Sequence, residues 1–446
     1  MPADRPHLLY LAYYFPPSRA SGVFRARATA NYFARQGWDV TVLRAPDRFF
    51  YDIIGSVDEA LTGQIDPRVE VLQPDMDYFA WENDLRRYSW WRGNFPVLAQ
   101  RRYQRRLART FPEQYFTWAE SAVKAGRRLH RKRPVDLVVA TGNPFASFWA
   151  AWDLGRRTGA PFVVDYRDSW TLDQFDNTDK FPPEHPSWAW EERILRSAAA
   201  SVHVNDALRD WHSQRYPLAA DRMQVVLNGW DPDMMDAEDL GGPAAEDRPL
   251  SFAFVGTLTH VQPIDSLLEG YRIMSDRDRH PGAGLDFYGH IGFFSTGEMK
   301  LRAQLGLDRE IEGVRYRGPV PKSQIATAYA DSDVLVFLNG GSRYVTTGKV
   351  FEYMATGKPI VSVHEKGCAA EELLRDYPLW FEPESLDPVD VAAAMAEAGD
   401  AARKADADTA ERARAYARSF TRDSALAGFE TWARDLVGRH SSANRR

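Results

Sequence analysis

The chain has almost no cysteine and no long apolar run. Cys368 is the single cysteine among 446 residues, which excludes a disulfide framework and a cysteine-rich metal site and fits a reducing compartment. No apolar run approaches the roughly 20 residues that span a bilayer. The first residues also lack the basic start and apolar core of a secretory signal. We therefore expect a cytoplasmic protein, either free or peripheral at the inner face of the membrane.

An excess of positive charge is also missing. The chain has 56 basic and 62 acidic residues, a net charge of −6, which gives no global case for nucleic-acid binding. Its apolar content of 44% and charged content of 26% are typical of a globular protein. A length of 446 residues exceeds one ordinary hydrophobic core, so we expect two domains.

The most informative stretch lies between residues 331 and 363. The apolar run from Val334 to Leu338 is typical of a parallel strand buried on both faces, and Asn339-Gly340-Gly341 ends it. A helix is predicted to begin near Thr347 and end at Gly357, before another apolar run at 360–363. Open α/β sheets bind anionic ligands at such a loop and helix start.

Side chains of this helix suggest a nucleotide site. The free amides of Gly348 and its neighbours could hold phosphate, and Lys349 would add a positive charge. Glu352 follows one turn later on the same face, where its carboxylate could accept hydrogen bonds from two adjacent hydroxyls. The alternative is that Lys349 and Glu352 form a solvated surface pair, and the spacing alone leaves both interpretations open.

The segment TTGKVFEYMATGKPIVS resembles the donor-site segment of family 4 glycosyltransferases, which have the GT-B fold. In that family the matching lysine contacts the nucleotide diphosphate and the matching glutamate contacts the ribose. The resemblance implies that Thr347, Gly348, Lys349 and Glu352 bind the donor. It also implies a catalytic role for Lys349 at the departing diphosphate.

The start of the chain carries a second part of the resemblance. A buried strand at 8–11, a glycine turn, a helix and a strand at 40–43 form one βαβ unit without the GxGxxG of a dinucleotide dehydrogenase. The run YFPPSRASGVFRARATANYFARQGWDVTVL resembles the opening of family 4 glycosyltransferases, where the glycine loop faces donor and acceptor. By position, Gly22 is predicted to bind the donor and Arg25 to lie on the acceptor side.

The acceptor-side prediction rests on two further strand ends. A buried strand at 135–140 ends in Thr141-Gly142-Asn143-Pro144, and we place Asn143 on the acceptor side. The strand that follows ends in Asp-x-Arg-Asp-x-Trp, which resembles a segment near the acceptor in the same family. Asp168 is the candidate acceptor-orienting group or base. The alternative is a carboxylate that pairs with Arg167 or caps a turn.

A second strand–glycine series begins at Leu250. The run from Phe252 to Gly256 matches the family in spacing, which places Gly256 and Thr257 in the donor site. The chain departs from the family in this half. Many members carry a glutamate where Tyr344 stands, and no Asp or Glu occurs from residue 339 to 350.

Two positive contacts to the diphosphate are also replaced. Where many members carry an arginine and a lysine, this chain has Thr257 and Gln262. Arg343, His260 and Lys322 are candidate substitutes.

The expected fold is GT-B, an α/β architecture of two Rossmann-like, doubly wound parallel-sheet domains facing a cleft. The predicted domains are 1–230 on the acceptor side and 250–423 for nucleotide-sugar binding. They are joined by an acidic, glycine- and proline-bearing linker at 231–249. Residues 424–446 are expected to form a helix that crosses back to the first domain, followed by a tail.

The first domain contains a strongly basic insertion. Between Arg86 and Arg133, fourteen Lys and Arg residues stand against two Glu and are interleaved with aromatic residues. That pattern predicts binding to an anionic membrane surface. The alternative is a helical hairpin with a solvated basic face and an aromatic core side.

The resemblance implies transfer of a hexose from a nucleotide diphosphate sugar to an acceptor hydroxyl, with retention of configuration. The acceptor would be a glycan, a lipid-linked glycan or a natural product. No cofactor and no metal are expected, because no Asp-x-Asp pair follows a predicted strand near the glycine loops. Two alternatives stay open: a nucleotide-sugar 2-epimerase of the same fold, and a non-catalytic sugar-nucleotide-binding or membrane-associated assembly protein.

Overall fold

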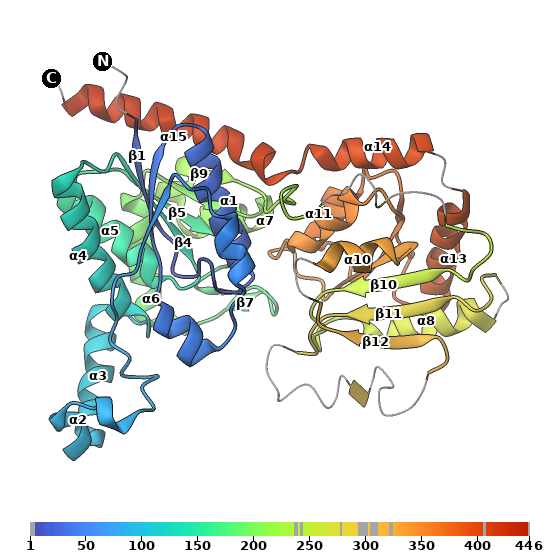
Figure 1. Cartoon of the computed structure of the whole chain (residues 1–446), viewed down its shortest axis with the longest axis horizontal. Coiled ribbons are helices and arrows are strands. Elements are labelled where there is room, and N and C mark those ends of the chain that lie inside the picture. Colours follow the sequence, from blue (N-terminus) through green and yellow to red (C-terminus); the bar gives the residue numbers. More distant parts are fainter. Residues whose placement is uncertain are drawn as a thin grey trace. The chain divides into compact units, whose positions relative to one another are not determined.

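The computed structural model describes residues 5–235, 240, 244–276, 279–292, 302–303, 311–320, 324–404 and 407–444. Lys322 and parts of the predicted linker at 231–249 lie outside these residues. The chain divides into two compact units, the first formed by Met1–Val226 with Leu426–Arg446 and the second by Leu227–Ala425. Each unit is built on one parallel sheet (Figure 1).

The first unit contains a seven-stranded sheet in the order β3-β2-β1-β4-β5-β8-β9. All neighbouring strands are parallel. The central strands β1 and β4 are buried along their whole length, as expected for a sheet covered on both faces. The strands are β1 (His7–Leu11), β2 (Asp39–Leu43), β3 (Val69–Leu72), β4 (Leu137–Gly142), β5 (Phe162–Tyr166), β8 (Ala200–His203) and β9 (Met223–Val225), with a small antiparallel pair β6 (Leu172–Asp173) and β7 (Thr178–Asp179).

Helices connect these strands in the βα order that the sequence predicts. The helices are α1 (Gly22–Arg35), α2 (Trp90–Asn94), α3 (Pro96–Thr110), α4 (Phe116–Lys132), α5 (Ala146–Thr158), α6 (Pro186–Ser197) and α7 (Asp206–Arg215), with short helices η1 (Phe49–Ile54), η2 (Glu59–Gln64), η3 (Leu85–Arg87) and η4 (Pro217–Arg222).

The second unit contains a six-stranded parallel sheet in the order β12-β11-β10-β13-β14-β15. The elements are β10 (Ser251–Val255), α8 (Ile264–Asp276), β11 (Gly284–Tyr288), β12 (Val314–Gly318), α10 (Ile325–Ala330), β13 (Val334–Asn339), α11 (Gly348–Ala355), β14 (Ile360–His364), α12 (Ala369–Leu374), β15 (Trp380–Phe381), α13 (Pro388–Lys404) and α14 (Ala407–Arg418).

Two hydrophobic cores cover the two faces of this second sheet. Phe252 and Phe254 point into a core shared with α8 and α13. Ala253 and Val255, which alternate with them along β10, point into a core shared with α10, α11 and α12. The sheet is therefore doubly wound, as the uninterrupted apolar run at 334–338 predicted.

The last helix, α15 (Arg422–Asn444), belongs to the first unit from Leu426 onward. Its Phe429 ring packs edge-on against Phe33, at a centroid distance of 5.8 Å. The indole Nε1 of Trp38 donates a hydrogen bond of 2.6 Å to Glu430. The chain thus returns to its first domain at the C-terminus, and the fold of two parallel-sheet domains agrees with the GT-B expectation.

The basic insertion folds as helices, but only part of its aromatic content is buried. Tyr103, Phe111, Phe116 and Trp118 are buried, as the hairpin interpretation expected. Large apolar side chains at the other end are exposed: Leu85, Trp90, Trp91, Phe95, Val97 and Leu98, with Trp90 74% exposed. We call residues 85–110 the arm, and Figure 1 shows its helices α2 and α3 projecting from the first unit. Among the described residues no helix is both long and apolar enough to cross a membrane.

The buried carboxylate of Glu191 connects α6 to β5, to the loop after β5 and to the end of α7. Glu191 is fully buried and accepts hydrogen bonds from the hydroxyls of Tyr166 (3.0 Å), Thr171 and Tyr216 (2.7 Å), while His212 Nε2 lies 3.5 Å away. Burial alone would raise the pKa of Glu191, but the interactions with His212, Thr171 and Tyr216 outweigh burial and lower that pKa. Its stabilisation is therefore present above the unfolded pKa of about 4.3 and is lost as the pH falls through the lower folded value.

Replacing Glu191 by Ala should destabilise the first unit strongly. Three buried hydroxyls would lose their acceptor, and each buried polar group left unsatisfied costs about 1–3 kcal/mol. We expect the free energy of unfolding to fall by about 3 kcal/mol or more in urea titrations at neutral pH. The neighbouring Glu192→Ala is the control, because Glu192 is exposed and pairs only at 3.7 Å with Arg196. Equal stability of both variants would contradict this account of the network.

Candidate functional site

One side-chain amide ties the loop that follows β10 to the end of β13. Gln262 Nε2 donates to the carbonyl of Thr257 (3.3 Å) and to that of Leu338 (3.4 Å). Its Oε1 accepts the backbone N–H of Thr259 at 2.9 Å. Gln262, which stands where many family members have a lysine, therefore braces this loop against the end of β13 at the carboxyl edge of the sheet. Gly256 and Thr257 lie in this loop, at the edge where the site was predicted.

The loops that follow β10, β11 and β13 approach one another so closely that glycine is required at two positions. A Cβ at Gly289 would lie 1.7 Å from the carbonyl oxygen of Gly256, and Gly289 has φ of +135°. A Cβ at Gly340 would lie 2.6 Å from the carbonyl oxygen of Val261. The backbone at the end of β10 is thus packed directly against the backbone that follows β11 and β13.

Helix α11 begins where the sequence predicted it. Thr347 is its N-cap, and the Thr347 hydroxyl accepts the N–H of Lys349 at 3.3 Å. Farther along, the Tyr353 hydroxyl accepts the N–H of Val255 (2.8 Å) and donates to the Val255 carbonyl (3.2 Å). The helix is therefore fixed to β10, and its first turn opens toward the loops just described. Gly348, in that turn, has open space where a side chain would lie.

Lys349 and Glu352 form a pair at the first turn of α11. Lys349 Nζ lies 3.1 Å from Glu352 Oε2 and 3.3 Å from the hydroxyl of Tyr329. The Tyr329 hydroxyl donates to the same Glu352 oxygen at 2.7 Å. The Glu352 side chain is 11% exposed and the Lys349 side chain 25%, so this is not the fully solvated surface pair of the alternative interpretation.

Tyr329, on α10, is a site residue that the sequence analysis missed. Burial, together with the charge of Glu352, raises the pKa of Tyr329 well above its ordinary value, so the phenol stays protonated and acts as a donor. Its hydrogen bond to Oε2 orients the carboxylate of Glu352. No local motif identifies this tyrosine, because it comes from a separate helix 23 positions before Glu352.

The loop before α11 lacks a carboxylate of its own. Tyr344, which stands where many family members have glutamate, is buried, and its hydroxyl accepts a hydrogen bond of 2.9 Å from Arg343. A carboxylate reaches the loop from β14 instead: a Cβ at Gly341 would lie 2.7 Å from Oε2 of Glu365. His260 is exposed on the neighbouring loop. The structure thus places Arg343 at Tyr344 and adds Glu365, which the sequence analysis did not select.

Lys358, in the Gly-Lys-Pro segment, has a structural position. Its ammonium donates to the backbone carbonyls of Tyr329 (2.6 Å), Ala330 (3.3 Å) and Ser332 at the end of α10. Burial lowers the pKa of Lys358 to about 8. This lysine satisfies the C-terminal carbonyls of α10, and it thereby fixes the helix that carries Tyr329.

In the first unit, Asn143 and Asp168 of the predicted acceptor side and Gly22 of the predicted donor site lie around Arg167. The Arg167 guanidinium donates to the carbonyls of Gly142 (2.6 Å) and Asn143 (2.7 Å). It also fills the space beside Gly22, where a Cβ would lie 1.6 Å from its Nη1. Asp168 is 43% exposed and 4.0 Å from Arg167 Nε, so its carboxylate is not held in a close ion pair with Arg167.

Arg25 lies deeper in the first unit than these residues. Its guanidinium makes a close, two-pronged contact with Asp165, with the shortest distance at 2.8 Å, and donates to the carbonyl of Val226 at 3.0 Å. Both side chains are buried. In this unit Arg25 therefore ties α1 to β5 and to the end of the domain.

Glu113 is a second feature that sequence reasoning missed. Its Oε1 accepts the N–H of Phe145 at 3.0 Å, at the start of α5, while its Oε2 is buried with no hydrogen-bond partner among the described residues. Burial raises the pKa of Glu113 to about 8, so the group is a neutral acid at neutral pH. Its hydrogen bond to Phe145 fixes the loop that contains Asn143.

One group of side chains among the described residues has the composition of a metal site: His364, Cys368 and Glu371. They lie at the end of β14 and the start of α12. Burial raises the pKa of the Cys368 thiol to about 11, so the free side chain is not a thiolate nucleophile.

Two glycines of this unit make a matched test of the loop packing. Gly289→Ala should lower the free energy of unfolding by at least about 2 kcal/mol, because the new Cβ meets backbone and the φ angle strains any other residue. Gly348→Ala should leave stability unchanged or slightly raised, because its Cβ enters open space in a helix. Urea unfolding of both variants measures the difference, and a stable Gly289→Ala would refute the close packing.

Comparison with known families covers both units. Residues 22–229 match a family model described as Glycosyl transferase 4-like domain. Residues 249–400 match a model described as Glycosyl transferases group 1. Together the two models span most of the chain, with one model on each parallel sheet. No curated protein matches the sequence.

Solved structures with the same fold are distant in sequence. A sucrose-phosphate synthase from Thermosynechococcus elongatus is similar at a TM-score of 0.67 and 14% identity, over 98% of this chain and 100% of that one. A glycosyltransferase from Rickettsia africae ESF-5 is similar at a TM-score of 0.65 and 14% identity, over 97% of this chain and 99% of that one. Anabaena Alr3699/HepE, solved with UDP and glucose, is similar at a TM-score of 0.59 and 15% identity, over 97% of this chain and 100% of that one. The chain belongs to the family 4 glycosyltransferases, enzymes with the GT-B fold.

Proposed function

We propose that this glycosyltransferase moves a hexose from a nucleotide diphosphate sugar to an acceptor hydroxyl. The observation that carries the proposal is the Lys349–Glu352 pair at the first turn of α11, beside the loops after β10 and β13. A cation and a carboxylate at a helix N-terminus suit a diphosphate next to a ribose. The similar Anabaena structure was solved with UDP and glucose, which supports a donor of this class.

The chemical difficulty is the charge that develops on the departing diphosphate. In our proposal the amides at the start of α11, with Gly348 leaving room for close approach, and the Lys349 ammonium stabilise that charge. Glu352, oriented by Tyr329, accepts hydrogen bonds from the ribose hydroxyls. We propose that no metal takes part in the transfer, because these groups supply the positive potential.

Asp168 is the proposed acceptor-orienting group or base. It is half-exposed, and its neighbour Arg167 donates to two backbone carbonyls, so the carboxylate can receive a hydroxyl proton. Gly22 and Asn143 border the same guanidinium. We further propose that the reaction retains the anomeric configuration, as the family implies, although Tyr344 replaces the usual glutamate.

The arm supplies the proposed membrane contact. Its exposed apolar side chains, Trp90, Trp91, Phe95, Val97 and Leu98, lie next to the exposed Arg101, Arg102 and Arg105 of α3. Exposed aromatic rings beside arginines suit the interface of an anionic bilayer. We therefore propose a peripheral enzyme at the cytoplasmic face of the membrane, with a lipid-linked glycan as acceptor.

Kinetics of two variants test the donor site. Lys349→Ala should lower turnover as well as donor affinity, because the phosphate that it contacts gains charge during the reaction. A lost charge-assisted contact of this kind costs roughly 2–4 kcal/mol, or about 30- to 1000-fold in rate. Glu352→Gln should raise the donor KM more than it lowers kcat, because a ribose contact is equally strong in ground and transition states.

Lys404→Ala, at an exposed lysine on α13, is the control and should behave as wild type. A thermal-shift panel of nucleoside diphosphates and their sugars first identifies the donor, since a ligand at 100-fold excess over Kd stabilises by roughly 2.7 kcal/mol. Wild-type kinetics in both site variants would refute the donor site.

Loss of transfer in chelator, restored by Mg²⁺ or Mn²⁺, would refute metal-free chemistry. Donor conversion without any acceptor would point to an epimerase.

Sedimentation with anionic vesicles tests the arm. Each basic residue near an anionic surface contributes about 1 kcal/mol to binding. Changing Arg101, Arg102 and Arg105 together to Glu should therefore weaken vesicle binding at low salt by about 100-fold. The double variant Trp90→Ser/Phe95→Ser should reduce vesicle binding at low and at high salt alike, because it removes apolar insertion, which salt does not screen.

The matched control reverses three exposed arginines outside the arm: Arg375, Arg412 and Arg439. That variant changes net charge equally and should sediment as wild type. Equal loss in both triple variants would show a non-specific charge effect. If the arm binds no vesicles but mediates self-association, the exposed aromatic residues form a protein interface instead.

A further inference from the structure

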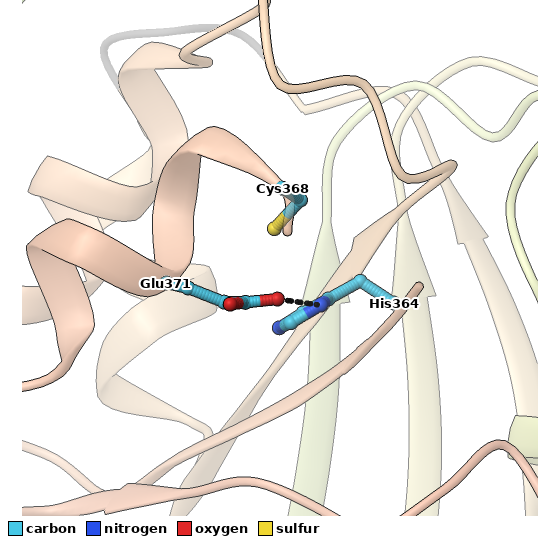
Figure 2. A group of neighbouring side chains, drawn as sticks. All are labelled: His364, Cys368 and Glu371. Atoms are coloured by element: carbon cyan, nitrogen blue, oxygen red, sulfur yellow. Dashed lines mark ion pairs between the residues drawn. The ribbon is translucent and has the colours of Figure 1, made fainter. Parts of the chain in front are cut away.

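Three side chains with different ligand chemistry meet at the end of β14. His364 is its last residue, Cys368 is the N-cap of α12, and Glu371 lies in the first turn of that helix. Their ligand atoms all lie within 4.8 Å of one another, and Figure 2 shows the three side chains turned toward a common point. His364 and Cys368 are buried and Glu371 is partly buried. None of them belongs to the donor residues proposed above.

The spacing of these atoms suits a small tetrahedral ion. Metal–ligand bonds of about 2.0–2.3 Å in a tetrahedral zinc site place ligand atoms about 3.3–3.8 Å apart. His364 Nδ1 lies 3.6 Å from Glu371 Oε1, which is within this range. The ligand atoms of the whole group lie within 4.8 Å of one another, so an ion would draw the more distant atoms together by up to about 1 Å. A nitrogen, a sulfur and a carboxylate oxygen together favour zinc over magnesium or calcium, which take oxygen ligands.

Neighbouring groups would support such an ion. His364 Nε2 lies 3.1 Å from the Ser362 hydroxyl, which also accepts the indole N–H of Trp380 at 2.7 Å. An Nε2–H that donates to this hydroxyl leaves Nδ1 as the ligand atom, the arrangement common for metal-bound histidine.

We propose that His364, Cys368 and Glu371 form a Zn²⁺ site with three protein ligands and a fourth position open to water. Binding releases the thiol proton of Cys368 to solvent and places the histidine proton on Nε2, so that Nδ1 leaves the Glu365 carbonyl that it contacts at 2.9 Å. The ion takes no part in the sugar transfer proposed above. It fixes the turn between β14 and α12.

This turn adjoins the loop that leads into α11. His364 pairs in register with Asn339 at the end of β13, and the N–H of Ala369 donates to the carbonyl of Ser342 at 3.4 Å. An ion here braces the loop between β13 and α11 from the side of β14. The short sequence separation of the three ligands keeps the ordering cost of the site low.

Cobalt substitution in the full-length, untagged chain tests the site. Cys368 is the single cysteine, so a thiolate-to-Co²⁺ charge-transfer band can arise only there. We expect the band to saturate at one Co²⁺ per chain and to disappear when Zn²⁺ is added. Cys368→Ser should abolish it, and His364→Ala and Glu371→Gln should each weaken Co²⁺ binding at least about tenfold. Glu372→Gln, at an exposed position on the same helix, is the matched control and should bind as wild type.

Absence of the band in the wild-type chain would overturn the proposal and leave a hydrogen-bonded packing cluster. A band that persists unchanged in His364→Ala and Glu371→Gln would also overturn it, because the ion would then be held by the thiolate alone. If those variants do not fold by circular dichroism, protection of Cys368 from alkylation by Zn²⁺ in the wild type replaces them. Equal alkylation rates with and without Zn²⁺ would then refute the site. None of these measurements depends on sugar transfer.

Discussion

Parallel pairing of buried strands is the constraint on which the other features depend. A parallel strand can be followed only by a crossover, so every loop that leaves its carboxyl end emerges at one edge of the sheet. In the second unit this brings together Gly256, the Gln262 loop, the glycines after β13 and the first turn of α11. Tyr353 then fixes α11 to β10 by two hydrogen bonds to a single residue. The site is therefore a product of the sheet.

Charged groups in both units are held by dedicated partners, and the partners decide what each charge can do. Arg25 is enclosed by Asp165, and Glu191 by three hydroxyls, so these charges support the fold. Lys349 and Glu352 share Tyr329, and the Lys349 side chain is 25% exposed while that of Glu352 is 11% exposed. Asp168 is the most open of the predicted carboxylates. Lys349 and Asp168, the groups proposed for the donor and acceptor, are thus more exposed than the charges that hold the fold together.

The arm and the His364 group show two features that lie outside the transfer chemistry. The arm leaves large apolar side chains in solvent beside arginines, an arrangement that isolated globular domains rarely keep. The His364 group brings a nitrogen, a sulfur and a carboxylate oxygen together at the end of β14, beside Asn339 at the end of β13. Neither feature includes a residue of the proposed donor site.

Local pattern was enough to predict much of the fold. Uninterrupted apolar runs marked β1, β4 and β13 as buried parallel strands, and Thr347 and Gly357 marked the ends of α11, because these signals depend on neighbouring residues only. The Lys349–Glu352 pair was also predictable, since three positions on a helix return a side chain to the same face. The family resemblance extended these local signals to two domains and a returning C-terminal helix.

Tertiary structure alone decided which distant residues complete each site. Tyr329, Glu365 and Arg167 reach their places from separate elements, and no spacing in the sequence encodes the distances between them. One of the two interpretations of the insertion put its aromatic residues on a core side, but burial divides them: Trp118 is enclosed and Trp90 is not. Burial depends on what packs against a helix, and that is a property of the whole fold. The sequence therefore determined the elements and the pairs within them, whereas contacts between elements were settled only when the chain was packed.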